Sequence, residues 1–276
     1  SKEVVDGIFG QISAVLDNAN IEYVKWDMNR SLMDVFSVMT KDQGRVMYDY
    51  VLGLYDFLDR MVKRYPDLLI EGCSGGGGRF DAGMLYYTPQ IWCSDNSDAV
   101  DRLRIQYGTS FGYPVSAMGA HVSAVPNHQT GRITPLHTRG VVAMSGTFGY
   151  ELDLLKLTEE EKDEVRSQIG EFRKYAPLIQ NGRVLSPDRS VLRVRVCAWE
   201  IVGKFSGRSS AQCVMEEIHG NMTVNYVQLR GLDESALYKE QATGRIYSGA
   251  ALMHGGMPLP AEFGEYRAYQ YHFVRE

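Results

Sequence analysis

The sequence has no apolar run approaching the ~20 residues of a membrane-spanning helix, so we expect no membrane-embedded segment. It also lacks a basic stripe, since 29 Lys and Arg stand against 34 Asp and Glu and the formal net charge is −5. Without such an electrostatic footprint we expect no nucleic-acid partner. The 276 residues, 44% of them hydrophobic, are enough for one large domain or one and a half.

Cysteine is scarce, and the four cysteines show no CxxC spacing, which argues against a zinc or thioredoxin-type site. Reduced thiols are typical of cytosolic proteins, so we expect a cytoplasmic location. The histidine spacings match no zinc signature, and we expect no metal. The sequence starts at Ser1 with no initiating Met and no signal peptide, so we expect it to be cut from a longer chain or to follow a tag.

Runs with strand character alternate with helical patterns over the first part of the chain, which predicts parallel βαβ units. In a (β/α)8 barrel the chemistry lies where strands end. The alternation therefore predicts an α/β TIM barrel. Because the sequence shows five candidate strands rather than eight, we expect this chain to hold about the last five strands of the barrel. The expected strands cover about residues 21–28, 68–71, 90–94, 115–122 and 141–148, and the expected helices 3–18, 44–65, 98–107 and 158–175. The last helix should begin with a Thr158–Glu161 capping box and end at Pro177.

The pattern changes after about Leu178, where short β-like runs are separated by Gly, Asp and Asn. These runs cover residues 191–199, 211–217, 222–229, 236–241 and 246–252, and the aromatic-rich end covers 259–276. They predict a small antiparallel β domain. We therefore expect a catalytic barrel portion over residues 1–180 and a C-terminal β domain over 181–276.

Two aspartates follow strands of the predicted barrel. Asp27 ends the first strand, and Asp95 ends the third. A retaining glycosidase needs such a pair, one carboxylate to attack the anomeric carbon and one carboxylic acid to protonate the leaving oxygen. An Asp after a strand is more often a turn or helix cap. Asp98 competes with Asp95 for the acid role, although Asp98 is the better candidate for a helix cap.

A glycine run, Gly75 to Gly78, follows Cys73 and Ser74. The Gly-Lys-Ser/Thr ending of a phosphate-binding loop is missing, which excludes that function. A flexible turn and close backbone approach to a ligand both stay open. Cys73 has no partner nearby in sequence that would make it a covalent nucleophile. Aromatic side chains that either stack on a sugar or fill the core are Trp26, Tyr86, Tyr87 and Trp92.

Taken together, three segments resemble glycoside hydrolase family 36, the microbial α-galactosidases. They are Tyr-Val-Lys-Trp-Asp-Met-Asn-Arg at 23–30, Glu-Gly-Cys-Ser-Gly-Gly-Gly-Gly-Arg-Phe-Asp at 71–81 and Trp-Cys-Ser-Asp-Asn-Ser-Asp at 92–98. The resemblance implies that Asp27 is the nucleophile and Asp95 the acid/base. It further implies that the galactose-binding residues are Lys25, Asn29, Cys73, Gly75 and Trp92.

The same resemblance implies a hydrolase of terminal α-D-galactosides of the melibiose or raffinose type, without metal or organic cofactor. It would act by double displacement with retention, on small oligosaccharides, within a homo-oligomer that is a tetramer in the family. Family members carry a β-sandwich and three further barrel strands that this sequence does not contain. Galactosyl transfer of the raffinose or stachyose synthase type, α-N-acetylgalactosaminidase activity and a non-catalytic carbohydrate-binding fragment stay open as alternatives.

Overall fold

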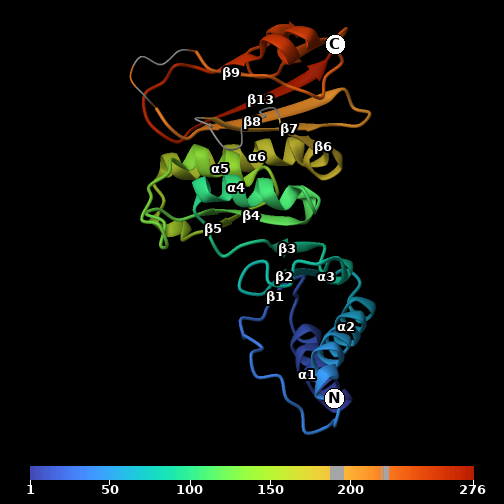
Figure 1. Cartoon of the computed structure of the whole chain (residues 1–276). Coiled ribbons are helices and arrows are strands. Elements are labelled where there is room, and N and C mark those ends of the chain that lie inside the picture. The colour runs from blue at the N-terminus through green and yellow to red at the C-terminus, as the bar shows by residue number, and fades with distance from the viewer. Residues whose placement is uncertain (187–195, 219, 221–223) are drawn as a thin grey trace. The chain divides into compact units, whose positions relative to one another are not determined.

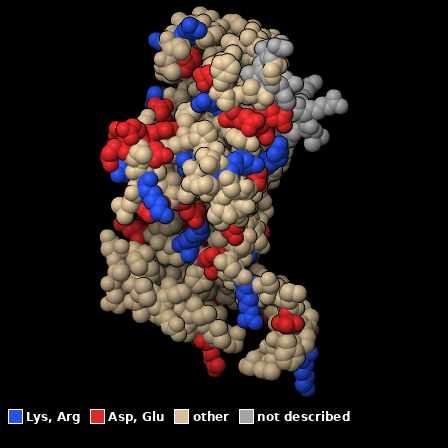
Figure 2. All heavy atoms as spheres, turned by 90° about the vertical axis from the view of Figure 1, so that its left-hand side faces the viewer, with Lys and Arg blue, Asp and Glu red and all other residues tan. Residues whose placement is uncertain are grey.

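The computed structural model describes residues 1–186, 196–218, 220 and 224–276, and it divides into two compact units, Ser1–Asp95 and Asn96–Glu276 (Figure 1). Acidic and basic side chains are interspersed on the face in Figure 2, which fits the near balance of charges in the sequence. No helix in the described residues is long and apolar enough to cross a membrane.

The first unit contains three parallel strands in the order β1-β2-β3 and three helices. Their bounds are α1 Lys2–Asp17, β1 Tyr23–Asp27, α2 Val46–Arg64, β2 Leu69–Cys73, α3 Ala82–Tyr87 and β3 Gln90–Trp92. The apolar face of α2 buries Phe57, Leu58 and Met61 against the strands. Trp26 stacks on Phe57 with ring centroids 4.8 Å apart, so this Trp belongs to the core. The opposite face of these strands carries the polar residues.

The second unit begins with the parallel pair β4 and β5 and three helices. The bounds are α4 Ala99–Ser110, β4 Met118–Ser123, α5 Leu136–Ala143, β5 Thr147–Glu151 and α6 Glu159–Asn181. Thr158 caps α6 and Glu161 returns the bond to the Thr158 backbone, as the capping-box pattern predicted. Within this unit, α5 and α6 lie between the β4–β5 pair and an antiparallel sheet (Figure 1).

Three expected elements were wrong in part. The run 246–252 is a strand only as far as Ser248, and a π-helix begins at Ala251. The run 141–148 was predicted as a strand, but its first part belongs to α5 and the strand begins only at Thr147. Val141, Val142 and Ala143 are all buried, and an apolar run buried on every side has no period that separates strand from helix. Pro177 does not end α6, which continues to Asn181. Burial of Leu178 and Ile179 stabilises this last turn despite the missing backbone donor.

The rest of the second unit is antiparallel, as predicted, with the strand order β11-β10-β13-β8-β7-β6. The bounds are β6 Arg183–Leu185, β7 Val196–Val202, β8 Arg208–Met215, β10 Leu237–Glu240, β11 Ile246–Ser248 and β13 Arg267–Arg275, with β9 Tyr226–Val227 pairing β12 Met257–Pro258 and a π-helix at Ala251–Gly255. Parts of the expected runs 191–199 and 222–229 lie outside the described residues. The core of this layer includes Leu229, Leu252 and Phe273.

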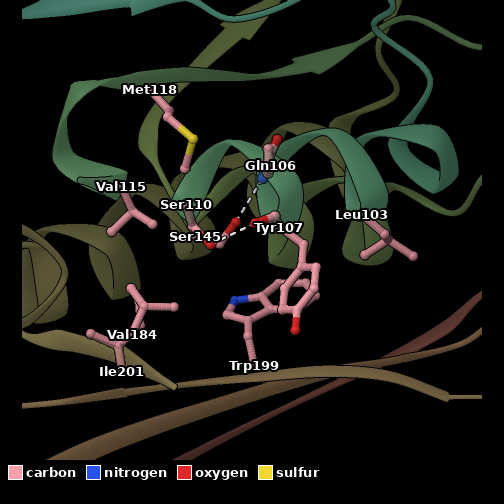
Figure 3. Close-up of a pocket in the computed structure, with 10 residues that line it drawn as sticks. All are labelled: Leu103, Gln106, Tyr107, Ser110, Val115, Met118, Ser145, Val184, Trp199 and Ile201. Atoms are coloured by element: carbon pink, nitrogen blue, oxygen red, sulfur yellow. Dashed lines mark hydrogen bonds between the residues drawn. The ribbon is translucent and has the colours of Figure 1, made fainter. Parts of the chain in front are cut away.

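The helices pack on this sheet through large side chains. Trp199 from β7 and Tyr107 from α4 both line a small cavity, and Gln106 donates to Ser145 at its wall (Figure 3). The cavity that these residues line has a volume of about 20 Å³, room for about one water molecule. It is too small for a sugar ring, so this junction is structural.

Candidate active site

Four of the residues predicted for the site, Lys25, Asp27, Cys73 and Trp92, lie on one face of the strands of the first unit. The parallel register pairs Lys25 with Glu71 and Asp27 with Cys73. Side chains alternate along a strand, so these four lie on the same side of the sheet. Glu71 also pairs with Gln90 on β3, and Trp92, two residues later, shares that side. On this face of the sheet, Asp27 and Cys73 lie next to each other at the carboxyl ends of β1 and β2.

Asp27 is held by its neighbours. Asn29 Nδ2 donates to Asp27 Oδ2 at 2.9 Å, and Asn29 Oδ1 accepts the Gly75 N–H at 2.7 Å. Desolvation raises the pKa of Asp27, but the hydrogen bonds from Asn29 and Cys73, with help from Lys25, outweigh it and leave the pKa below its usual value. The Asp27 carboxyl is therefore ionised at neutral pH, as a nucleophile requires.

Cys73 is buried, with 4% of its surface exposed. Burial, together with its hydrogen bond to Asp27, raises the pKa of the Cys73 thiol to about 11. The thiol is therefore protonated at neutral pH and serves as a donor to Asp27. A protonated, buried thiol is a poor nucleophile, which argues against covalent catalysis by this cysteine.

Lys25 is placed between two partners. Its Nζ lies 3.8 Å from Glu71 Oε1 and 5.2 Å from the centroid of the Trp92 ring. Trp92 itself is 3% exposed, so its indole forms a buried floor beneath the ammonium group. Glu71 did not emerge as a site residue from the sequence. The sequence signal that could have found it is its spacing: Glu71 precedes Cys73 by two residues, just as Lys25 precedes Asp27 by two.

The glycine run approaches the strand end that carries Asp95. A Cβ added to Gly76, whose φ is +77°, would lie 2.7 Å from the Asp95 backbone nitrogen, and one on Gly77 would lie 2.6 Å from the Cys93 carbonyl oxygen. Only glycine permits this approach. These two glycines therefore contact the chain's own backbone, while a Cβ on Gly75 would meet only Asn29, 4.0 Å away.

Asp95 directly follows Ser94 at the end of the β3 segment and is exposed. Asp98, the alternative candidate for the acid, is 1% exposed, and its carboxylate is engaged in hydrogen bonds and an ion pair. The Asp98 carboxylate accepts the backbone N–H groups of Val100 and Asp101, accepts the Thr130 hydroxyl and pairs with Arg132. Asp98 is thus the cap of α4, as its position in sequence suggested. In the described ranges, no group of three or more His, Cys, Asp or Glu could hold a metal ion.

Two family models match the chain. "Melibiase" covers residues 1–182, and "Glycosyl hydrolase family 36 C-terminal domain" covers residues 196–273. The chain belongs to glycoside hydrolase family 36. It is 58% identical over 276 residues to the "Bifunctional alpha-galactosidase/sucrose kinase AgaSK" of Mediterraneibacter gnavus, covering 99% of this chain and 28% of that protein. It is 48% identical to "Alpha-galactosidase Mel36A" of Lactobacillus acidophilus, covering 99% and 37%.

Solved structures of family 36 confirm the fold class. The galactosidase domain of AgaSK, 56% identical, matches with a TM-score of 0.95 over 100% of this chain and 37% of that one. A variant of AgaA from Geobacillus stearothermophilus in complex with raffinose, 43% identical, matches with a TM-score of 0.95 over 100% and 38%. The five parallel strands are thus part of a barrel, followed by the antiparallel domain, and the chain spans well under half the length of these relatives.

Proposed function

We propose that this chain carries the catalytic pair of a retaining α-galactosidase that hydrolyses terminal α-D-galactosyl residues of oligosaccharides of the melibiose or raffinose type. The observation that carries the proposal is the ionised carboxylate of Asp27, held at the end of β1 by Asn29 and the Cys73 thiol. Membership in family 36 supports the substrate class, because its relatives are named α-galactosidases and one was solved with raffinose.

The proposed reaction is a double displacement. Asp27 attacks the anomeric carbon while Asp95 donates a proton to the departing glycosidic oxygen, which gives a galactosyl ester on Asp27. Asp95, now a carboxylate, then takes a proton from water as the water attacks the same carbon. Two inversions leave the α configuration unchanged. The approach of Gly76 to the Asp95 backbone supports this assignment, because it fixes the strand end that carries the acid.

The binding roles follow from placement on the same face. Lys25, Asn29 and the Gly75 backbone supply polar contacts to galactose hydroxyls, Cys73 borders the pocket near the 2-hydroxyl, and Trp92 forms part of its wall. The ionisation of Asp27 and the protonation of Cys73 support these roles, because they leave a charged acceptor beside a neutral donor. No cofactor takes part in the proposed steps.

The wider organisation belongs to the same proposal. A division near residue 180 into barrel and β domain is supported by the change from α/β to antiparallel structure after α6. A homo-tetramer follows from the family resemblance alone. A cytoplasmic location is supported by the sparse cysteines and by the sucrose kinase fused to one relative.

The test is hydrolysis of a chromogenic α-galactoside by the whole protein and by Asp27→Asn. The variant keeps the shape of the side chain but removes its charge, so kcat should fall by at least about 10³-fold, the scale on which removal of a covalent nucleophile acts. Equal rates for wild type and variant would overturn the nucleophile. Galactose binding without hydrolysis by either would favour a binding fragment. A product of galactosyl transfer in excess of hydrolysis, with raffinose as acceptor, would favour the synthase alternative.

A further inference from the structure

Glu71 is a buried acid beneath an accessible base. Its side chain is 2% exposed, whereas that of Lys25 is 35% exposed. Burying a carboxylate without a partner costs several kcal/mol, roughly, so a buried acid needs donors or an opposite charge. Because Lys25 and Glu71 are register partners on β1 and β2, the sheet itself brings them together.

The two carboxylate oxygens of Glu71 have different partners. The Tyr23 hydroxyl donates to Oε2, and Gln90 Nε2 in turn donates to the Tyr23 hydroxyl at 3.4 Å. Oε1 has no hydrogen-bond partner in the described residues and lies 3.8 Å from Lys25 Nζ. The Tyr23 bond therefore fixes the carboxylate plane and leaves Oε1 directed to the ammonium group.

Lys25 is thereby restrained from two sides, by the Glu71 carboxylate and by the Trp92 ring. A lysine side chain loses up to about 2 kcal/mol of rotamer entropy on being ordered, and a site that orders it beforehand spares the ligand that cost. Lys25 and Asp27 are two residues apart on β1, so their side chains lie on the same side of the sheet.

We infer that Glu71 is a positioning residue, which holds the Lys25 ammonium at the Asp27 face so that it meets a galactose hydroxyl in a fixed orientation. The inference rests on the proposed function, since it assigns Lys25 a sugar hydroxyl as ligand. Glu71 touches neither sugar nor reacting atoms, and its whole effect passes through Lys25.

The experiment is a double-mutant cycle on hydrolysis of a chromogenic α-galactoside, with Glu71→Gln, Lys25→Met and the combination. Glu71→Gln keeps the size and the Tyr23 acceptor but removes the charge. We expect KM to rise about tenfold with kcat changed less than threefold, since a contact made equally in ground and transition states is lost. In the Lys25→Met background, Glu71→Gln should change KM less than twofold, because the residue it acts through is gone.

A structural role for Glu71 predicts other results. In one case the effects of Glu71→Gln and Lys25→Met on KM, expressed as free energies, would add in the double variant. In the other case Glu71→Gln would lower kcat and thermal stability and leave KM unchanged. Either result overturns the inference. Glu200→Gln is the matched control, because Glu200 is also buried, at 0% exposed, and its carboxylate accepts hydrogen bonds from Ser209 and from the backbone of Arg230 and Gly231, all in the second unit. It should lower the melting temperature and leave KM unchanged.

Tyr23→Phe covers the case in which Glu71→Gln fails to fold. It removes the donor that orients the carboxylate and keeps both charges, so KM should rise about threefold and kcat should hold; an unchanged KM overturns the inference. Calorimetric titration with galactose separates the two proposals. If the wild type hydrolyses the substrate and Glu71→Gln binds galactose as tightly as the wild type does, only the positioning role is disproved. Wild type that neither hydrolyses nor binds galactose disproves the proposed function, and the positioning role with it.

Discussion

Gly76 lies so close to Asp95 that a Cβ on the glycine would stand 2.7 Å from the Asp95 backbone nitrogen. The same glycine has a φ of +77°, a conformation that other residues adopt at a cost. The loop after β2 and the end of β3 are thus packed backbone to backbone. Through the glycine run, the loop that hydrogen-bonds Asn29 beside the proposed nucleophile Asp27 also packs against the backbone of the proposed acid/base Asp95.

Gly76→Ala should therefore damage catalysis more than it damages folding. Relieving the clash requires the Asp95 backbone to move, and a displacement of about 1 Å in a catalytic group costs on the order of 10²-fold in rate. We expect kcat/KM to fall by that amount while circular dichroism stays native. Gly112→Ala is the control, because an added Cβ meets nothing within 4 Å there. Equal activity of both variants would show that the contact is unimportant.

Azide should rescue a variant without the nucleophile. In Asp27→Gly the small anion enters from the face that the carboxylate vacates, so a single inversion converts an α-galactoside with a good leaving group into β-galactosyl azide. The product is identified by NMR from its anomeric coupling. Recovery of α-galactosyl azide would contradict the assignment of Asp27.

Asp95→Ala and Asp98→Ala should fail in different ways. Without Asp95, substrates with leaving groups that need protonation should slow by 10²-fold or more, the usual scale of general acid catalysis, and activated aryl galactosides much less. Without Asp98, α4 loses its cap and Arg132 loses one of its two acidic partners, so the unfolding free energy should fall by about 1–2 kcal/mol or more. Thermal melts and a leaving-group series distinguish them. A leaving-group dependence in Asp98→Ala instead would reverse the two roles.

Asn29→Ala should move the acid limb of the pH–kcat/KM profile. The ionised form of Asp27 is the active one, and its pKa lies below the ordinary value, so activity is present above that pKa and is lost as the pH falls through it. Removing the Asn29 donor raises the pKa of Asp27, and the acid limb should therefore shift to higher pH. Asn181→Ala, which removes the hydrogen bond from Asn181 Nδ2 to the Pro177 carbonyl at the end of α6, serves as control. An unmoved acid limb in Asn29→Ala would mean that the remaining interactions of Asp27, with Cys73, the Met28 backbone and Lys25, set its protonation.

Local pattern was sufficient for much of the fold. The apolar spacing of α2, the capping box of α6 and the polar residues at the ends of β1 and β3 are all encoded within a few neighbouring residues. The motif residues Lys25, Asp27, Cys73 and Trp92 could be named before any coordinates, because the segments that contain them resemble glycoside hydrolase family 36. At residues 141–143 of α5, where every side chain is apolar and buried, the same reasoning failed, since such a run has no distinctive period.

The sequence by itself determined which side chains alternate toward one face of each strand, because that alternation is a property of the backbone. Only the tertiary structure decided which of them meet. The register of β1 on β2 sets Lys25 against Glu71 and Asp27 against Cys73, and the turn after β2 brings Gly76 onto Asp95. Register and loop packing depend on contacts between residues far apart in the chain, and no local pattern fixes those.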